Sequence, residues 1–300
     1  MNILITGGCG HIGSYLIRNL DYSYNITVVD NLLTNRFCSL FDLNRKIKFI
    51  EKDIDDITIE ELDEFDIVIH LAAITDAAGS FGNKKEIEDT NINKTKNLID
   101  RCEKSKVSKF IFPSSTSVYG VSADTVTEDD NRYLNPQSPY AESKILIERY
   151  LKSTTLNYNI FRFGTIFGYS IGMRFHTAIN KFCYQSCTGV PLTIWKENYE
   201  QVRPYLGLTD CLKSIEMAID KDLPNGIYNV LSQNVKLSDV VKVIKNQNNN
   251  LLVNFVDTPL LNQFTYNVSY DKISKYGFTP QNNLEHEIPK IIKKISNING

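Results

Sequence analysis

The chain has 300 residues, of which 42% are hydrophobic and 23% charged, and these proportions are typical of a folded globular protein and exclude a largely disordered one. Its formal net charge of −2 provides no electrostatic attraction to nucleic acid or to an anionic membrane, so neither is predicted as a partner. The N-terminus enters an apolar strand without signal-peptide features, and no window is apolar enough to span a bilayer, so we expect a cytoplasmic protein.

The first half of the chain alternates short apolar strands with amphipathic helical stretches. Strands are predicted at Ile3–Thr6, Ile26–Asp30, Ile47–Ile50, Ile67–Leu71, Phe110–Pro113 and Tyr158–Phe163, and helices at Ile12–Leu20, Lys84–Ser105 and Pro139–Ser153. Continuous apolar runs are typical of strands covered on both faces, and repeated strand–helix–strand units predict a parallel sheet. We therefore predict an α/β fold with a doubly wound, Rossmann-type sheet, whose ligands lie at the carboxyl ends of the strands.

This regular alternation ends near residue 163. A helix is predicted near Thr177–Cys187, short strands near Leu192–Trp195 and Tyr228–Val230, and a terminal helix near Glu285–Ile295. We expect residues 1–165 to form the first domain and residues 166–300 to form mainly a smaller substrate-binding lobe, with some segments returning to the first domain. The six cysteines and four histidines are scattered without metal-ligand spacing, so reduced thiols and no metal site are predicted.

A glycine-rich turn connects the first strand to the first helix. Gly8, Gly10 and Gly13 match the pattern G-x-G-x-x-G, in which missing β-carbons let the backbone approach a pyrophosphate at the N-terminus of the helix. Asp30 ends the second strand, where a carboxylate accepts hydrogen bonds from the adenosine ribose and repels a 2′-phosphate. The turn therefore predicts NAD rather than NADP as the cofactor, and a plain turn with a capping aspartate is the alternative.

The predicted cofactor site extends to the ends of the neighbouring strands. Asp53 follows the third strand and is placed either to meet the adenine edge or to cap the next helix. Leu71–Ala73 offer small residues where the cofactor would pass the fourth strand. The residues predicted on these grounds to bind NAD are Gly7, Gly10, His11, Ile12, Gly13, Asp30, Asn31, Asp53, Ile54, Leu71, Ala72 and Ala73.

Tyr140 and Lys144 form a candidate proton-transfer pair that would also contact the nicotinamide end of the cofactor. They are four residues apart and share one helix face. A phenol with a pKa near ~10 is a poor base at neutral pH, but a neighbouring ammonium and a positive nicotinamide ring favour the phenolate. A tyrosine–lysine pair on a solvated helix face is the alternative.

A hydroxyl-rich segment, Ser114–Gly120, follows the fifth strand and would face the same crevice as Tyr140. One of its hydroxyls could donate to the substrate oxygen and share its proton with the phenolate. Serine and threonine clusters are also common in turns and caps. The combination with the glycine-rich turn and the tyrosine–lysine pair favours a catalytic function.

In this order, the elements resemble the extended short-chain dehydrogenase/reductase family, and within it the nucleotide-sugar epimerases and dehydratases typified by UDP-glucose 4-epimerase. The resemblance covers most of the chain. It rests on Thr6–Gly13, Asp30–Leu32, His70–Ala73, Asn91, Ser114–Gly120, Tyr140–Lys144, Arg162–Gly168 and Arg203–Tyr205 leading to Asp210. It implies that Tyr140 is the catalytic base, Lys144 its activator and Ser115 the hydroxyl on the reacting oxygen.

The same resemblance implies the reaction and the substrate. The enzyme would be an NAD-dependent 4-epimerase of a nucleoside-diphosphate sugar, which oxidises C4 to a ketone and then returns the hydride to the other face. Asn91 would support the cofactor site, and Arg203 would meet the substrate diphosphate unless it is an ordinary surface arginine. Ser117, Thr165 and Arg174 are further candidates for substrate contacts.

Two departures from the family pattern bear on the reaction. The dehydratase branch carries Thr-Asp-Glu after the fifth strand, whereas this chain has Ser115–Ser117 with no carboxylate, which disfavours 4,6-dehydration. Thr165 stands where many relatives place an asparagine. A C4 dehydrogenase that releases the keto sugar is the nearest alternative to an epimerase, and a non-catalytic NAD-sensing protein is a remote one.

Relatives pair the helices corresponding to Lys84–Ser105 and Pro139–Ser153, which implies a homodimer.

Overall fold

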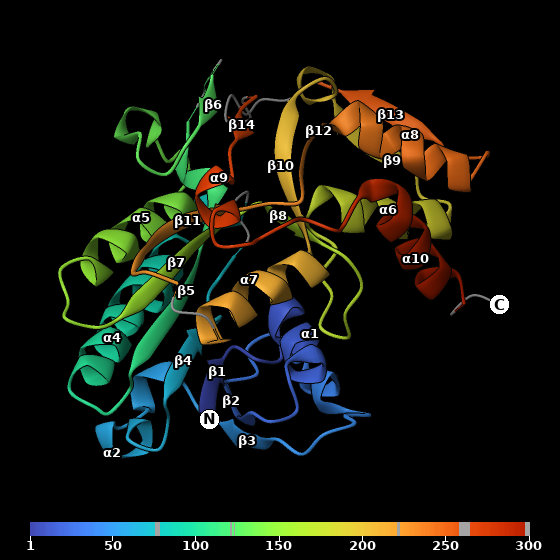
Figure 1. Cartoon of the computed structure of the whole chain (residues 1–300). Coiled ribbons are helices and arrows are strands. Elements are labelled where there is room, and N and C mark those ends of the chain that lie inside the picture. The colour runs from blue at the N-terminus through green and yellow to red at the C-terminus, as the bar shows by residue number, and fades with distance from the viewer. Residues whose placement is uncertain (76–78, 121, 123, 221–222, 258–264, 298–300) are drawn as a thin grey trace.

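A computed structural model of the chain describes residues 1–75, 79–120, 122, 124–220, 223–257 and 265–297. This part of the chain is built around a seven-stranded parallel sheet in the order β11-β7-β5-β4-β1-β2-β3 (Figure 1). Its strands are β1 (Asn2–Thr6), β2 (Asn25–Asp30), β3 (Lys48–Glu51), β4 (Ile67–His70), β5 (Lys109–Ser115), β7 (Tyr158–Phe163) and β11 (Gly226–Val230). The predicted α/β fold with a doubly wound parallel sheet is therefore confirmed.

The winding direction of this sheet reverses at β1, which pairs with β2 on one side and with β4 on the other. A crevice for ligands forms at such a point because the chain leaves the two central strands toward opposite faces. The strand predicted near Tyr228–Val230 belongs to this sheet, since β11 pairs in parallel with β7. The chain thus returns to the large sheet after leaving it, and the division into two lobes near residue 165 remains a prediction.

Helices cover both faces of the sheet. One face packs against α1 (His11–Asn19) and α7 (Leu208–Asp220), and the other against α2 (Ile59–Leu62), α4 (Thr95–Glu103) and α5 (Pro139–Leu151). Leu16 and Ile215 represent the first interface and Leu98 and Ile147 the second, and each is at most 1% exposed. Each such buried side chain contributes about 1.5–3 kcal/mol of transfer free energy. Helix α7 was not predicted from the sequence.

A second region lies beyond the carboxyl ends of the sheet, at the upper right of Figure 1. It contains a three-stranded sheet and a two-stranded one, and helices α6, α8 and α10 pack against each other over a shared core. Its elements are β8 (Thr165–Phe167), α6 (Ala178–Thr188), β9 (Leu192–Trp195), β10 (Val202–Gly207), β12 (Gln233–Lys236), α8 (Leu237–Gln247), β13 (Val253–Val256) and α10 (Leu284–Ser296). Shorter elements are α3 (Lys84–Ile87), β6 (Thr125–Val126), β14 (Asn267–Val268) and α9 (Asp271–Ser274). The predictions for α6, β9 and α10 match, whereas α8 was missed.

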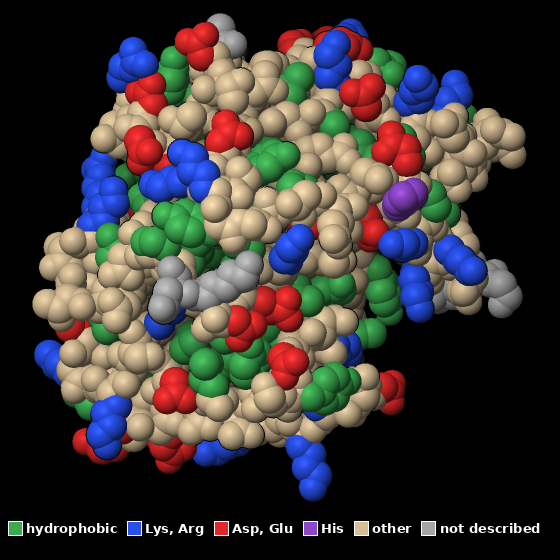
Figure 2. Space-filling model, in the orientation of Figure 1, with side chains coloured by type: hydrophobic (Ala, Val, Ile, Leu, Met, Phe, Trp, Pro, Cys, Tyr) green, Lys and Arg blue, Asp and Glu red, His purple; other side chains and the backbone are tan. Residues whose placement is uncertain are grey.

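The surface agrees with the nearly balanced charge of the sequence. On the face shown in Figure 2, lysine and arginine side chains are interspersed with aspartate and glutamate side chains. Within the described ranges, none of the helices combines the length and the apolar character that crossing a membrane requires.

Candidate active site

A cavity of about 770 Å³ opens at the carboxyl ends of the central strands, between the large sheet and the second region. Residues that follow β1, β2, β4 and β5 form one side of it, and residues from β8 to β10 form the other. All but one of the predicted site residues line this cavity. They are Gly7, Gly10, His11, Ile12, Gly13, Asp30, Asn31, Asp53, Ile54, Leu71, Ala72, Ala73, Ser115, Ser117, Tyr140, Lys144, Thr165, Arg174 and Arg203. The exception is Asn91.

The glycine-rich turn is held in a backbone shape that side chains would not allow. Gly7 has a φ of +69°, and a β-carbon there would lie 2.5 Å from the backbone nitrogen of Ala72. A β-carbon on Gly13 would lie 2.5 Å from the α-carbon of Gly8. The N-terminus of α1 follows, and no side chain among the described residues caps it. Its free N–H groups and partial positive charge suit a pyrophosphate.

Asp30 serves the turn as well as the cavity. Its Oδ2 accepts a hydrogen bond from the backbone N–H of Cys9 at 3.0 Å, and its Oδ1 accepts one from Leu32 at 2.9 Å. The carboxylate therefore caps backbone groups, as the alternative interpretation held, while its side chain also lines the cavity. The two functions do not compete, because each carboxylate oxygen can accept more than one hydrogen bond.

Asp53 acts as a helix cap and also lines the cavity, and its contact with adenine remains a prediction. It caps a short helical turn by accepting a hydrogen bond from the N–H of Asp55, and it also accepts from Asn31 and from the ammonium of Lys94 at 3.1 Å each. Burial acts to raise the pKa of Asp53, but these hydrogen bonds outweigh it and keep the pKa below its ordinary value. The ionised carboxylate lines the same cavity as Asp30.

Asn91 lies behind the cavity wall and is buried. Its amide accepts a hydrogen bond from the N–H of Ile74 and donates one to the carbonyl of Ile74, both at 2.8 Å, and it also reaches Ser143 on α5 at 3.4 Å. The helix predicted over Lys84–Ser105 is interrupted here by a π-helical segment, η4 (Glu88–Lys94), which carries this side chain. Asn91 thus fixes the wall that follows β4, so any effect it has on a cofactor is indirect.

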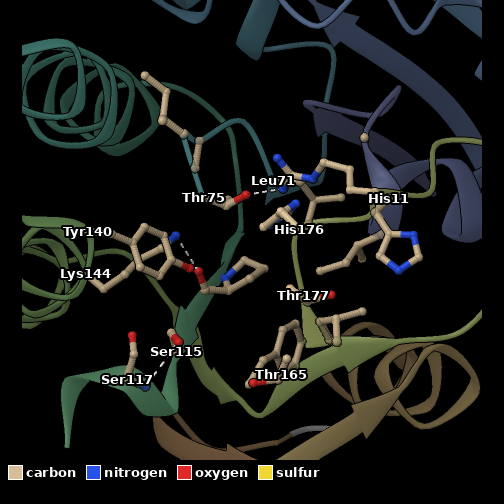
Figure 3. Close-up of a pocket in the computed structure, with 18 of the residues that line it drawn as sticks. His11, Leu71, Thr75, Ser115, Ser117, Tyr140, Lys144, Thr165, His176 and Thr177 are labelled. Carbon is tan, nitrogen blue, oxygen red and sulfur yellow. Dashed lines mark hydrogen bonds between the residues drawn. The ribbon is translucent and has the colours of Figure 1, made fainter. Parts of the chain in front are cut away.

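Tyr140 and Lys144 project from α5 toward the end of β5, where Ser115 lies (Figure 3). The helix starts immediately before Tyr140, because Ser138 caps it through the N–H of Ala141 and proline occupies its first position. The ammonium of Lys144 donates to the carbonyl of Pro113 at 2.8 Å and lies 5.7 Å from the centre of the Tyr140 ring. The structure therefore brings the phenol, the ammonium and the Ser115 hydroxyl together at one point of the cavity.

Burial sets the pKa values of this group. It raises the pKa of Tyr140 to about 12, against the opposing effects of the Arg174 charge and a hydrogen bond with Ser115. Burial lowers the pKa of Lys144 to about 8, and the carboxylate of Glu148 acts in the opposite direction. In the protein alone the phenol therefore keeps its proton at neutral pH, and a further positive charge beside it is needed to favour the phenolate.

Further hydroxyls and cations line the cavity on both of its sides. The Ser117 hydroxyl is buried and has no hydrogen-bond partner among the described residues. Arg174, in the segment after β8, contacts the hydroxyl of Thr75, which follows β4. Arg203 is half-buried rather than exposed, with its guanidinium 5.4 Å from the centre of the Tyr266 ring. In the described part of the chain, no carboxylate pairs with Arg203.

The structure adds a contact that sequence reasoning missed. The segment after β8 packs against the glycine-rich turn so closely that a β-carbon on Gly172 would lie 2.5 Å from the carbonyl oxygen of Gly10. His11 is held between Ser170 at 2.8 Å and Asn180 at 3.3 Å. Burial lowers the pKa of His11 to about 3, so its ring is neutral. The only signal of this contact in the sequence was Gly172 itself, in an irregular segment, and it did not indicate that the glycine-rich turn would be its neighbour.

Comparison with known proteins gives consistent results. The model of the NAD dependent epimerase/dehydratase family matches residues 3–230. An uncharacterized UDP-glucose epimerase of Bacillus subtilis is 31% identical over 74% of this chain and 73% of its own length. A dTDP-D-glucose 4,6-dehydratase of Dictyostelium discoideum is 29% identical over 96% of this chain and 80% of its own length.

Among solved structures, UDP-glucuronic acid 4-epimerase of Bacillus cereus, crystallised with UDP-glucuronic acid and NAD, superposes with a TM-score of 0.90. It is 25% identical, and the alignment covers 99% of this chain and 100% of that one. UDP-N-acetylglucosamine 4-epimerase of Methanobrevibacter ruminantium is similar at 26% identity, with a TM-score of 0.88 and coverage of 99% and 98%.

Proposed function

This chain belongs to the NAD-dependent epimerase/dehydratase family, and from that premise we propose that it is a nucleotide-sugar 4-epimerase that acts through a transient 4-keto sugar. The match confirms the predicted family, the prediction of an enzyme and NAD as the cofactor. The observation that carries the proposal is the meeting of Tyr140, Lys144 and Ser115 in the cavity that also contains the glycine-rich turn.

The cavity fits a dinucleotide. Gly7 and Gly13 occupy positions that a β-carbon would obstruct, so the backbone is free to approach a pyrophosphate. The N-terminus of α1 and the carboxylate of Asp30 offer complementary groups for the pyrophosphate and the adenosine ribose. When bound, NAD accepts and returns a hydride and supplies a positive ring whose charge favours the phenolate of Tyr140.

The residues of the chain handle the proton and the position of the sugar. Tyr140 takes the proton of the sugar 4-hydroxyl as its C4 loses a hydride, so that a C=O bond replaces the C–O–H group. Ser115 donates a hydrogen bond to the reacting oxygen, and Lys144 stabilises the negative charge on the phenol oxygen. After the keto sugar has rotated in the site to present its other face, Tyr140 returns the proton while the hydride adds to the opposite face of C4.

The substrate side is assigned with the same logic. Arg203 binds the diphosphate of a nucleoside-diphosphate sugar, because a cation with no carboxylate partner in the described residues suits phosphate oxygens. Ser117, Thr165 and Arg174 contact the sugar or the diphosphate, and the unpaired Ser117 hydroxyl is free to bind a sugar oxygen. Asn91 supports the cofactor site through the backbone of Ile74.

Two other reactions use the same first step. A C4 dehydrogenase releases the keto sugar, and a 4,6-dehydratase loses the 6-hydroxyl as water. Dehydratases are among the relatives, but Ser115, Thr116 and Ser117 carry hydroxyl groups and provide no acidic pair for dehydration. A non-catalytic NAD-sensing protein would not need the intact set of Tyr140, Lys144 and Ser115.

The test is to incubate the protein with a panel of nucleotide sugars and follow them by NMR. An epimerase interconverts a pair of C4 epimers without net change in NAD. A keto product formed with one equivalent of NADH would identify a dehydrogenase, and a 4-keto-6-deoxy sugar would identify a dehydratase. Either result would replace the epimerase proposal.

Two broader assignments belong to the same proposal. We place the enzyme in the cytoplasm, in keeping with its six free cysteines. We also propose a homodimer that pairs the helices over Lys84–Ser105 and Pro139–Ser153. Light scattering of the purified protein tests the second assignment, since a monomer at working concentration would contradict it.

A further inference from the structure

A buried ion pair lies next to the segment that carries Ser115. Glu148 is on α5, one turn beyond Lys144 and on the same face of the helix. Its side chain is 3% exposed and that of its partner Arg162, on β7, is 2% exposed. Removing two charges from water this completely is unfavourable unless their hydrogen bonds are satisfied, so the contacts of this pair define what it does.

The pair is fully hydrogen-bonded, and its hydrogen bonds hold both ends of the segment from Ser114 to Tyr119. Arg162 donates to the two oxygens of Glu148 at 2.7–3.2 Å, and Glu148 also accepts a hydrogen bond from the Ser114 hydroxyl at 2.5 Å. The remaining guanidinium nitrogen of Arg162 donates to the Tyr119 hydroxyl at 2.8 Å. Ser114 and Tyr119 are therefore both fixed to the same buried pair.

The segment between these two anchors contains the groups assigned to proton transfer. Pro113, whose carbonyl accepts the hydrogen bond of Lys144, immediately precedes Ser114. Ser115 immediately follows it, and its hydroxyl accepts a hydrogen bond from the N–H of Ser117 at 3.1 Å. A shift of Ser114 would therefore move the acceptor of Lys144 and the hydroxyl of Ser115 together.

From these contacts we propose that Glu148 is a positioning residue for the hydride-transfer reaction. Its carboxylate, held by Arg162, ties Ser114 and thereby fixes the distance between Ser115 on β5 and Tyr140 on α5. The inference rests on the proposed function only for the identity of the reaction. The connection passes through one side-chain hydrogen bond and one peptide unit, so little freedom remains between the anchor and the catalytic hydroxyl.

The charge of Glu148 supports the same arrangement. Its carboxylate is the acidic group that acts on Lys144 and opposes the lowering of the lysine pKa by burial. The other titratable groups facing this point are Tyr140 on the same helix and the buried, neutral His70 on β4. Glu148 therefore helps to keep Lys144 in its ammonium form while fixing the carbonyl that binds it.

Ser114→Ala tests the proposal with little risk to folding, because it leaves the ion pair intact and removes only the tie. We expect kcat to fall about 10- to 100-fold through misplacement of Ser115, with KM and NAD affinity changed by much less. Hydrogen exchange in Pro113–Tyr119 should become faster. Ser214→Ala is the matched control, since Ser214 is an equally buried serine on α7 that donates to the carbonyl of Cys211.

A second variant removes the ion pair itself. Glu148→Met combined with Arg162→Met leaves no unpaired buried charge, and such replacements are often tolerated by the fold. We expect the same fall in kcat. A purely structural role would lower the melting temperature and leave kcat of the folded protein unchanged. If the double variant does not fold, kcat and hydrogen exchange of Ser114→Ala decide whether the inference holds.

The outcomes separate this inference from the proposed function. A wild-type enzyme without activity on any nucleotide sugar contradicts the proposed function, and the exchange rates of Pro113–Tyr119 then decide the positioning question alone. An active wild type with a Ser114→Ala variant of normal kcat and unchanged exchange overturns the inference.

Discussion

The two sides of the cavity are built in different ways. The cofactor side is made by the backbone, since Gly7 and Gly13 leave no room for a β-carbon and Asp30 accepts hydrogen bonds from two backbone N–H groups. The groups that we assign to proton transfer and to the substrate are instead side chains, among them Tyr140 from α5 and Arg203 from β10. A site made by the backbone tolerates almost no local change, whereas a site made by side chains allows single functions to be removed while the fold persists.

The largest expected effect is on the side-chain half. Tyr140→Phe should lower turnover by roughly 10²–10⁴-fold while NAD remains bound, because only the proton-transfer group is lost. Steady-state kinetics and NAD titration measure the two quantities separately. Tyr228→Phe is the control, since Tyr228 is also buried and donates to the carbonyl of Pro224 outside the cavity. Near-normal turnover of Tyr140→Phe would contradict the assignment of the base.

On the backbone half, Gly7→Ala should disturb both binding and folding. The new β-carbon meets the Ala72 backbone at 2.5 Å and requires a left-handed conformation, so the free energy of unfolding should fall by about 2–4 kcal/mol and NAD affinity with it. Gly189→Ala separates the causes, because Gly189 has a similar φ of +71° but open space around it. Equal destabilisation of both variants in denaturant unfolding would show that the close contact does not matter.

A smaller effect is expected for Arg203→Met, which keeps the apolar stem but removes the charge. Loss of a charge-assisted hydrogen bond to the diphosphate should raise KM about 10-fold, with a lesser change in kcat. Arg132→Met, at an exposed arginine paired with Asp130, is the control. An unchanged KM for Arg203→Met would reassign the diphosphate to another cation of the cavity.

The smallest effect concerns pH. Because burial lowers the pKa of Lys144 to about 8, its ammonium is present below pH 8 and is lost as the pH rises, so kcat/KM should fall on the alkaline side near that value. Glu148→Gln removes the carboxylate that supports the ammonium, and the decline should therefore move to lower pH. An alkaline decline that stays in place in this variant would mean that the charge of Glu148 does not reach the lysine.

Sequence reasoning succeeded where the determinants are local. The glycine-rich turn and the pairing of Tyr140 with Lys144 depend on spacing within a few residues, and both lie in the cavity as predicted. Helices α7 and α8 and the packing of Gly172 on Gly10 were missed. The packing of Gly172 on Gly10 joins segments far apart in the chain, and such a contact leaves no pattern in a single sequence. The two helices do carry a signal that was overlooked, since their buried residues recur at helical spacing, as at Leu208, Cys211, Leu212 and Ile215 of α7.

The position of β11 has a consequence for how the protein is made. During translation the large sheet stays one strand short until residue 230 has left the ribosome, and meanwhile β7 presents an unpaired edge. Contacts of such long sequence separation form slowly and expose the nascent chain to association with others. A fragment cut after residue 165 would keep that open edge permanently, so we expect it to associate with other chains more readily than the whole chain does.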